Sequence, residues 1–399
     1  MIIYLNNKPV GQIETSEDGR QFSYSSSYLN QSNALPISLS LPLDPQPYTE
    51  KIAKPFFDLI SPDIWESETE LHLPCAGSLS FYKDNPSSQP YCEIDITDCE
   101  ALLKSQCETI TDNRVIAITD IQPRLDISII EGEFFQAAEK NNNSHILKSD
   151  LIEFDDLVGN EIFVSLLAYN LGLSVPIISR VYLNDTPALV MDRPDRYVSE
   201  NATQLGPKIH HESFISALSN QIFGTRKKHH ISIDGQFDLI RQYASVPAVD
   251  CRSLIRVISL CLIAGCDDFP IENQLIEILP NNTCRLAPFS GFITTDLYPN
   301  TAKRFLDYLF GIQRFSSLKK SHLCDLAHKI RVNDKYLCTI MSDLSYQIPR
   351  IAKEIFETFP ALKSPITLKI AKLIDQRALT LRSLLLDKKQ IKETILEAS

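Results

Sequence analysis

The residues with the clearest chemical potential stand together between Gly265 and Asn273, where an apolar run ends. Two carboxylates, Asp267 and Asp268, follow the glycine, and Asn273 lies five positions beyond Asp268. In phosphoryl transfer, an Asp at this spacing orients and deprotonates the attacking hydroxyl, and the Asn holds a magnesium ion against the phosphates. The same residues also suit a polar turn that ends one helix and caps the next. The spacing alone leaves both interpretations open.

The elements that position this cluster are indicated by the pattern of apolar residues along the chain. Residues 1–30 alternate apolar and polar side chains around a Glu-Asp-Gly turn, which predicts a small antiparallel sheet. Residues 122–195 predict a second sheet, with strand candidates on both sides of a polar Asn-rich loop and a helix over 161–173. From about residue 210 onward, Leu and Ile recur at three- and four-residue steps, which predicts a large helical block.

The composition restricts the classes of protein to which the chain can belong. Its 399 residues are 44% hydrophobic and 22% charged, as in a globular protein with a substantial core. The net charge of −11 argues against direct binding of DNA or RNA, which usually requires a basic face, and is compatible with a basic partner. The ten cysteines form no Cys-x-x-Cys pair, so they indicate neither a zinc site nor a disulfide scaffold.

Targeting and membrane segments are not indicated by the sequence. The first residues, MIIYLNNKPV, lack the long apolar region of a signal peptide. The longest apolar run, from Leu254 to Gly265, contains Arg256 and is too short to cross a bilayer. We therefore expect a soluble, cytoplasmic protein that does not associate with membranes.

Several segments, in order along the chain, resemble the HipA-type toxins, which are bacterial serine/threonine kinases with a two-lobed, kinase-like fold. LPISLSLPL resembles the family's N-terminal subdomain, ALVMDRPDR the hinge between the lobes, IAGCDDFPIEN the catalytic loop and LAPFSGFI the segment that carries a metal-binding Asp. These segments occupy residues 35–43, 188–196, 263–273 and 286–293. The resemblance depends on their order over most of the chain, because no single motif decides it.

The resemblance implies an α+β, two-lobed protein-kinase-like fold with a β-rich N-terminal lobe and a mainly helical C-terminal lobe. Residues 1–120 would form the HipA N-terminal-like subdomain. Residues 121–195 would complete the N-terminal lobe with the nucleotide-binding sheet, a helix and the hinge. Residues 196–399 would form the helical lobe that carries the catalytic-loop-like segment.

The resemblance also implies roles for the residues of the first cluster. Asp268 fits the catalytic base, because it keeps the family's spacing to Asn273, and Asp267 is the alternative. Asn273 fits the magnesium ligand. A base in this position must come within hydrogen-bond reach of the substrate hydroxyl.

Four further residues fit the binding of ATP. Lys148, at the end of a strand, fits the lysine that contacts the α- and β-phosphates, and Glu161 fits its partner on the following helix. Alternatively, Lys148 is a solvated strand-end residue and Glu161 a first-turn residue that favours the helix dipole. Asp192 begins the hinge that would face adenine, and Gly132 is the remaining glycine of the phosphate loop.

Three departures from the family pattern concern the chemistry itself. In the phosphate loop, Glu131 and Glu133 flank Gly132, and each carboxylate would repel a phosphate about 5 Å away by roughly 3 kcal/mol unless it points elsewhere. In the catalytic loop, Pro270 and Glu272 replace the usual His and Lys.

The third departure lies in the metal segment. Ser290 and Gly291 replace its Tyr-Asp pair, so the carboxylate that would hold magnesium is absent. Asp296 lies five residues farther on and would need a rearranged loop to take its place.

These features favour a pseudokinase of a toxin–antitoxin type system that acts by binding. The alternative is an active serine/threonine kinase that uses ATP and Mg2+ to phosphorylate a protein such as an aminoacyl-tRNA synthetase. The cofactors are accordingly ATP and Mg2+ if the protein is active, or neither. By family analogy, the expected partner is a HipB-like helix-turn-helix antitoxin, together with a protein substrate or target.

Overall fold

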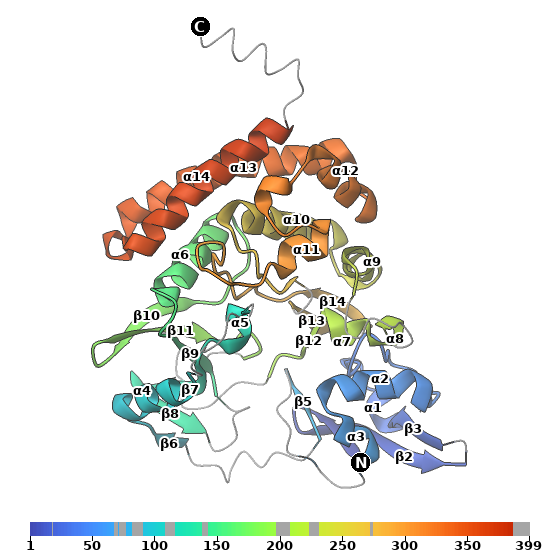
Figure 1. Cartoon of the computed structure of the whole chain (residues 1–399). Helices are drawn as coiled ribbons and strands as arrows, with labels where there is room; N and C mark the ends of the chain where they lie inside the picture. Colours follow the sequence, from blue (N-terminus) through green and yellow to red (C-terminus); the bar gives the residue numbers. More distant parts are fainter. Residues whose placement is uncertain are drawn as a thin grey trace, which may run out of the picture.

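The protein is described by a computed structural model that covers residues 1–17, 19–67, 71, 77–81, 91–107, 116–137, 143–196, 208–222, 231–271 and 274–385. Two sheet units lie side by side at one end of the molecule, and the helices of the C-terminal half cover them (Figure 1). The α+β, two-lobed architecture expected from the resemblance is confirmed. Within the described ranges, none of the helices has the length and apolar character that crossing a membrane requires.

The first unit is a five-stranded antiparallel sheet in the order β4-β3-β2-β1-β5. Alternation of apolar residues buries one face of its strands against aromatic side chains, among them Phe22, Phe57 and Trp65. The strands are β1 (Ile2–Leu5), β2 (Lys8–Ser16), β3 (Gly19–Tyr24), β4 (Tyr48–Thr49) and β5 (Leu79–Ser80). The helices are α1 (Ser26–Leu29), α2 (Glu50–Ile60) and α3 (Pro62–Glu66).

The second unit is a six-stranded sheet in the order β10-β11-β9-β7-β8-β6. Its strands are β6 (Tyr91–Glu93), β7 (Arg124–Ile130), β8 (Glu133–Ala137), β9 (His145–Ser149), β10 (Ile178–Leu183) and β11 (Thr186–Asp192). The helices of this region are α4 (Ile96–Ser105), α5 (Ile118–Ile121) and α6 (Leu157–Asn170). The helix predicted over 161–173 is confirmed as α6, which begins four residues earlier and stops just before Gly172, whose φ is +74°.

The C-terminal half is helical around a small third sheet of β12 (His211–Ser213), β13 (Leu275–Leu279) and β14 (Thr283–Leu286). Its main helices are α9 (Ile233–Tyr243), α10 (Pro247–Ala264), α12 (Lys320–Lys329), α13 (Asp334–Thr358) and α14 (Pro365–Leu385). Shorter ones are α7 (Phe214–Ala217), α8 (Ser219–Ile222) and α11 (Arg304–Phe310), with the 3-10 turns η3 (Phe315–Ser317) and η4 (Pro360–Leu362). The apolar helix α10 lies beneath the paired α13 and α14 and packs against both (Figure 1).

The segment 35–43 joins the first unit to the rest of the molecule. Ile37 and Leu41 pack in the core of the first sheet, whereas Leu39, between them, packs in the large core of the C-terminal half. The carboxylate of Glu212 accepts hydrogen bonds from the hydroxyl of Ser38 at 2.8 Å and the N–H of Leu39 at 2.7 Å. This extended stretch therefore lies at a seam between two cores instead of within one of them.

Candidate active site

The candidate catalytic loop starts where α10 ends sharply. Gly265 adopts a left-handed conformation with φ of +77°, and the N–H groups of Gly265 and Cys266 both donate to the carbonyl of Cys261 at 3.0 Å. A Cβ at Gly265 would lie 2.7 Å from Leu373 and 3.3 Å from Asp296. The glycine therefore allows the chain to turn directly into Asp267 and Asp268. Asn273 and Glu272 lie outside the described residues, so the predicted magnesium ligand is not placed.

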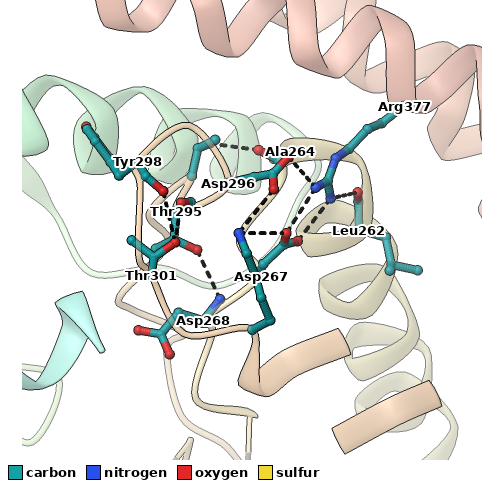
Figure 2. A network of polar contacts seen from close by, with 11 residues as sticks. Leu262, Ala264, Asp267, Asp268, Thr295, Asp296, Tyr298, Thr301 and Arg377 are labelled. Carbon is teal, nitrogen blue, oxygen red and sulfur yellow. Dashed lines mark hydrogen bonds and ion pairs between the residues drawn. The ribbon is translucent and has the colours of Figure 1, made fainter. Parts of the chain in front are cut away.

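The carboxylate of Asp268 is fully buried and already has a cationic partner. The Nε–H of Arg304, the first residue of α11, donates to Asp268 Oδ1 at 2.6 Å. The backbone N–H of Asp268 donates to the hydroxyl of Thr295 at 3.1 Å (Figure 2). Burial raises the pKa of Asp268 to about 6, and the charge of Arg304 limits that rise.

Arg304 also fastens the catalytic loop to the short helix α5. Its Nη1 donates to Asp120 at 2.9 Å, and its Nη2 donates to the hydroxyl of Thr119 at 2.9 Å. The Thr119 hydroxyl in turn lies 3.5 Å from the second carboxylate oxygen of Asp268. The guanidinium is thus a bridge between the helical half and the segment that leads into β7.

Asp267, the alternative base, belongs to a separate ion-pair network. Arg377 of α14 donates to its two carboxylate oxygens at 3.0 Å each, and Lys303 lies 3.4 Å away. The same two cations hold Asp296, at 2.7 Å from Arg377 and 3.1 Å from Lys303 (Figure 2). Burial raises the pKa of Asp296, but the charges of Arg377 and Lys303 outweigh it and hold the pKa below its usual value. Both carboxylates therefore anchor α14 to the loop.

Lys148 and Glu161 form the ion pair that the sequence suggests. Nζ of Lys148, on β9, donates to Glu161 Oε1 on α6 at 2.7 Å, and both side chains are largely buried. The second oxygen of Glu161 is buried without a hydrogen-bond partner. The nucleotide-binding role of the pair remains a prediction.

The pair is linked to the catalytic loop through the neighbouring residue Asn160. Its amide exchanges hydrogen bonds with the backbone of Thr294, at 2.8 and 3.1 Å. Thr294 directly precedes Thr295, which holds Asp268. The structure therefore brings Lys148, Glu161 and Asp268 to the same region of the molecule.

The hinge residues are mostly engaged within the protein. Asp192 lies 3.3 Å from His145 Nε2, and its N–H donates to the carbonyl of Ile177. The N–H of Arg193 donates to Ser144, and Pro194 has no N–H to offer. Few backbone donors of this hinge are accordingly available to an adenine edge.

Gly132 lies in the tight turn that joins β7 and β8. Glu131 and Gly132, with φ of +52° and +92°, are the two central residues of the β7–β8 hairpin. Lys148 pairs with Arg124 at the opposite end of β7, about 20 Å away along a strand of this length. The structure does not bring Gly132 to Lys148, and the exposed Glu131 and Glu133 are carried away with it.

Gly291, which replaces the expected metal-binding Asp, stands in an open position. Its φ is +82°, and a Cβ built there meets no atom within 4 Å. The buried Phe292 beside it stacks on Phe269 of the catalytic loop at 4.9 Å. The segment around Gly291 is therefore well packed, but Gly291 itself has no side chain that could bind a metal ion.

Sequence reasoning missed Lys303, Arg304 and Arg377, which neutralise the carboxylates of the loop. They lie 36 to 110 residues from the aspartates that they contact. The adjacent Lys-Arg pair at 303–304 is a weak signal, because its spacing to Asp267 and Asp268 belongs to no known motif. Only the folded chain brings these charges together.

Two family models match parts of this sequence. The HipA N-terminal domain matches residues 1–74, and the HipA-like C-terminal domain matches residues 116–352, more than half of the chain. The chain belongs to the HipA-like family. The range that matches the C-terminal domain contains Lys148, Glu161 and Asp268.

Two similar proteins accompany these HipA-like matches. A protein described as putative kinase Y4mE, from Sinorhizobium fredii, is 25% identical over 345 residues, which cover 76% of this chain and 79% of that protein. The HipA of Shewanella oneidensis MR-1, solved in complex with HipB and its operator DNA, shares 16% identity with a TM-score of 0.75 and covers 96% of both chains. At that identity the structural likeness shows the fold alone.

Proposed function

We propose that this HipA-like protein belongs to a toxin–antitoxin type system and acts by binding, without transferring a phosphoryl group. The observation that carries the proposal is the ion pair between Arg304 and Asp268, with 2.6 Å between Nε and Oδ1. A general base needs a free oxygen within reach of the substrate hydroxyl. Here one oxygen is held by a guanidinium that stays charged at any physiological pH, and the carboxylate is fully buried.

The metal side of the site supports the same proposal. In phosphoryl transfer, a carboxylate on the metal segment holds magnesium against the phosphates. Gly291 offers none, and Asp296, the nearest substitute, is neutralised by Arg377 and Lys303. Asn273 would then be the one predicted magnesium ligand left, and it offers no carboxylate, whereas Mg2+ in such sites is usually held through one or two carboxylates beside the phosphates.

An active kinase is the second candidate, and the Lys148–Glu161 ion pair favours it. The pair is formed at 2.7 Å, as in a kinase whose lysine is positioned for the α- and β-phosphates. ATP and Mg2+ would be the cofactors in that case. A pseudokinase that binds nucleotide without metal would keep the same ion pair, so this contact is expected both with and without phosphoryl transfer.

The proposed partner is a basic helix-turn-helix antitoxin of the HipB type. The HipA of Shewanella oneidensis was solved in complex with HipB and its operator DNA. The charge of −11 on this chain would attract a basic DNA-binding dimer and repel bare DNA.

The deciding experiment measures ATP affinity with and without Mg2+, together with transfer of the γ-phosphoryl group to the protein itself or to a generic Ser/Thr peptide. We expect no transfer, and an ATP affinity that changes less than about threefold when Mg2+ is added. Robust transfer that Asp268→Asn abolishes would establish the kinase instead. Lys148→Met serves as the control for nucleotide binding, because it removes the amine without touching the catalytic loop.

A further inference from the structure

A cavity of about 240 Å³ lies at the seam between the first sheet unit and the C-terminal half. One wall is apolar and comes mainly from α2 and β5: Phe56, Leu59, Ile60 and Leu79. The opposite wall is polar and comes from the segment around β12 and α7: His210, His211, Glu212, Ser213 and Ser216. A dry cavity of 150 Å³ holds a benzene molecule, so this one has room for a single ring with a polar substituent.

The polar wall contains buried groups that lack hydrogen-bond partners. Neither ring nitrogen of His211 has one, although the residue is only 2% exposed. His210, at 3% exposure, uses Nε2 to donate to the carbonyl of Ile37 at 3.0 Å, so Nδ1 is left as an acceptor without a donor. The hydroxyl of Ser78, next to the lining residue Leu79, is also buried without a partner. Such clustering is unusual, since buried polar groups in native proteins are nearly always satisfied.

The charges around the cavity define what it can accept. None of the residues lining it within the described ranges is a lysine or an arginine. Burial lowers the pKa of both His210 and His211 to about 4, so both imidazoles are neutral at pH 7. Burial raises the pKa of Glu212 to about 8, so this carboxyl is mostly protonated at that pH. Because both imidazoles are neutral, a bound anion would find no positive charge on the wall, and its desolvation would not be repaid.

More distant charges do not alter this conclusion. Asp195, Arg196 and Arg285 act on His211 from outside the lining, and their effects are smaller than that of burial. Glu212 faces the hydroxyl of Ser38 and the N–H of Leu39, which both donate to it. Nδ1 of His210 and both ring nitrogens of His211 are buried at this wall without a hydrogen-bond partner.

We propose that the seam cavity is a binding site for a small molecule without negative charge that combines an apolar ring with amide or hydroxyl donors. The ring lies against Phe56 and Leu79, and the donor reaches a ring nitrogen of His211, which lines the cavity. Because the two walls belong to different units, a bound molecule holds the first sheet unit against the C-terminal half. The proposal is independent of the nucleotide cleft and of the proposed function.

Three probes of similar size test separately the roles of the ring, the hydrogen-bond donor and the charge: toluene, benzamide and benzoate. Benzamide carries N–H donors, toluene has none, and benzoate replaces the amide by an anion. In ligand titrations followed by NMR on the full chain, we expect benzamide to bind about tenfold more tightly than toluene, a difference of about 1.4 kcal/mol. Benzoate is expected to bind more weakly than both.

Two variants locate the binding. His211→Phe keeps a ring of similar shape and removes both nitrogens, so it should abolish the preference for benzamide while toluene still binds. Ser216→Phe fills the cavity and should abolish binding of both probes. Ser383→Phe, on the exposed surface of α14, is the matched control and should bind as the unmodified chain does.

The proposal is overturned if benzamide and toluene bind the unmodified chain equally, or if benzamide shows no saturable binding. It is also overturned if His211→Phe retains the preference, or if benzoate binds as tightly as benzamide. Circular dichroism of each variant checks the fold, and the comparison of probes within one variant does not depend on its stability.

Discussion

At the scale of single residues, the decisive contact is the one between Arg304 and Asp268. The guanidinium donates hydrogen bonds to three groups at once, from α5 and from the catalytic loop, at 2.6 to 2.9 Å. A buried carboxylate of this kind needs a cation, because an unpaired charge in the interior is costly. Arg304 is that cation for Asp268.

Arg304→Gln should destabilise the protein by about 1–2 kcal/mol at pH 7.5, a value discounted because the arginine is 39% exposed. The loss should shrink at pH 5. Burial raises the pKa of Asp268 in the folded protein to about 6, above the ordinary 3.8. The folded state therefore binds a proton at Asp268 more tightly than the unfolded state does, and the stability that Asp268 contributes falls as the pH rises through 6. Without Arg304, protonation of Asp268 at pH 5 relieves the unpaired charge.

Urea unfolding at the two pH values measures this effect. Arg350→Gln is the control, because Arg350 pairs with Glu354 on the surface at 3.5 Å and should matter little at either pH. An equal loss for Arg304→Gln at pH 5 and pH 7.5 would show that the ion pair with Asp268 is not the cause.

Gly291→Asp should restore a magnesium ligand and raise Mg2+-dependent affinity for ATP about tenfold or more. Asp tolerates the left-handed backbone better than most residues, and the position is open. Adding Glu131→Gly and Glu133→Gln should change the affinity little, because their turn lies at the other end of β7 from Lys148.

Gly311→Asp is the matched control for this change. Gly311 has φ of +65° and equally open surroundings, but it follows the far end of α11. ATP titrations with and without Mg2+ compare the two variants. If Gly291→Asp and Gly311→Asp behave alike, position 291 is not the missing metal position.

At the scale of elements, the end of α10 determines where the loop carboxylates lie. The helix is buried around most of its length and stops at Gly265, directly before Asp267 and Asp268. Any side chain at 265 would strain the left-handed turn and press on α14 through Leu373. The loop position and the packing of α14 on α10 are therefore coupled at one residue.

Gly265→Ala should cost more stability than Gly172→Ala. Both glycines have similar left-handed φ values, +77° and +74°, so both variants pay about 1–2 kcal/mol of backbone strain. At Gly172 a Cβ meets nothing within 4 Å, whereas at Gly265 it lies 2.7 Å from Leu373. We expect an additional loss of about 1–3 kcal/mol from this overpacking, measured by urea unfolding. Equal losses of stability in the two variants would mean that Leu373 on α14 moves aside without an energetic penalty.

At the scale of the whole molecule, three sheets and a helical half meet at two seams. One seam passes through Arg304 and ties the second sheet to the catalytic loop. The other passes through Ser38, Leu39 and Glu212 and ties the first sheet to the C-terminal half. Both are polar contacts between segments far apart in the sequence, and at the second seam Leu39 also packs in the core of the C-terminal half.

The isolated chain should not bind operator-length DNA at physiological salt, because its net charge is −11. A mixture with a basic helix-turn-helix partner should bind, with the partner making the phosphate contacts. Fluorescence anisotropy of labelled DNA, with each protein alone and with both, tests this expectation. Tight binding by the chain alone would contradict it, as would failure of the mixture to form a complex on a sizing column.

The sequence by itself determined the elements and the family. Alternation and helical spacing depend on local burial, so the first sheet, α6 and the helical half could be predicted from the residues. The Asp–Asn spacing and the order of the motifs suggested a catalytic loop, and the Lys148–Glu161 pair followed from the resemblance. What only the tertiary structure decided is the state of that loop. The carboxylates of the loop pair with cations from distant positions: Lys303, Arg304 and Arg377. Leu39 packs in a different core from its neighbours Ile37 and Leu41. Neither could be predicted, because contacts between distant segments leave no periodic pattern in the sequence.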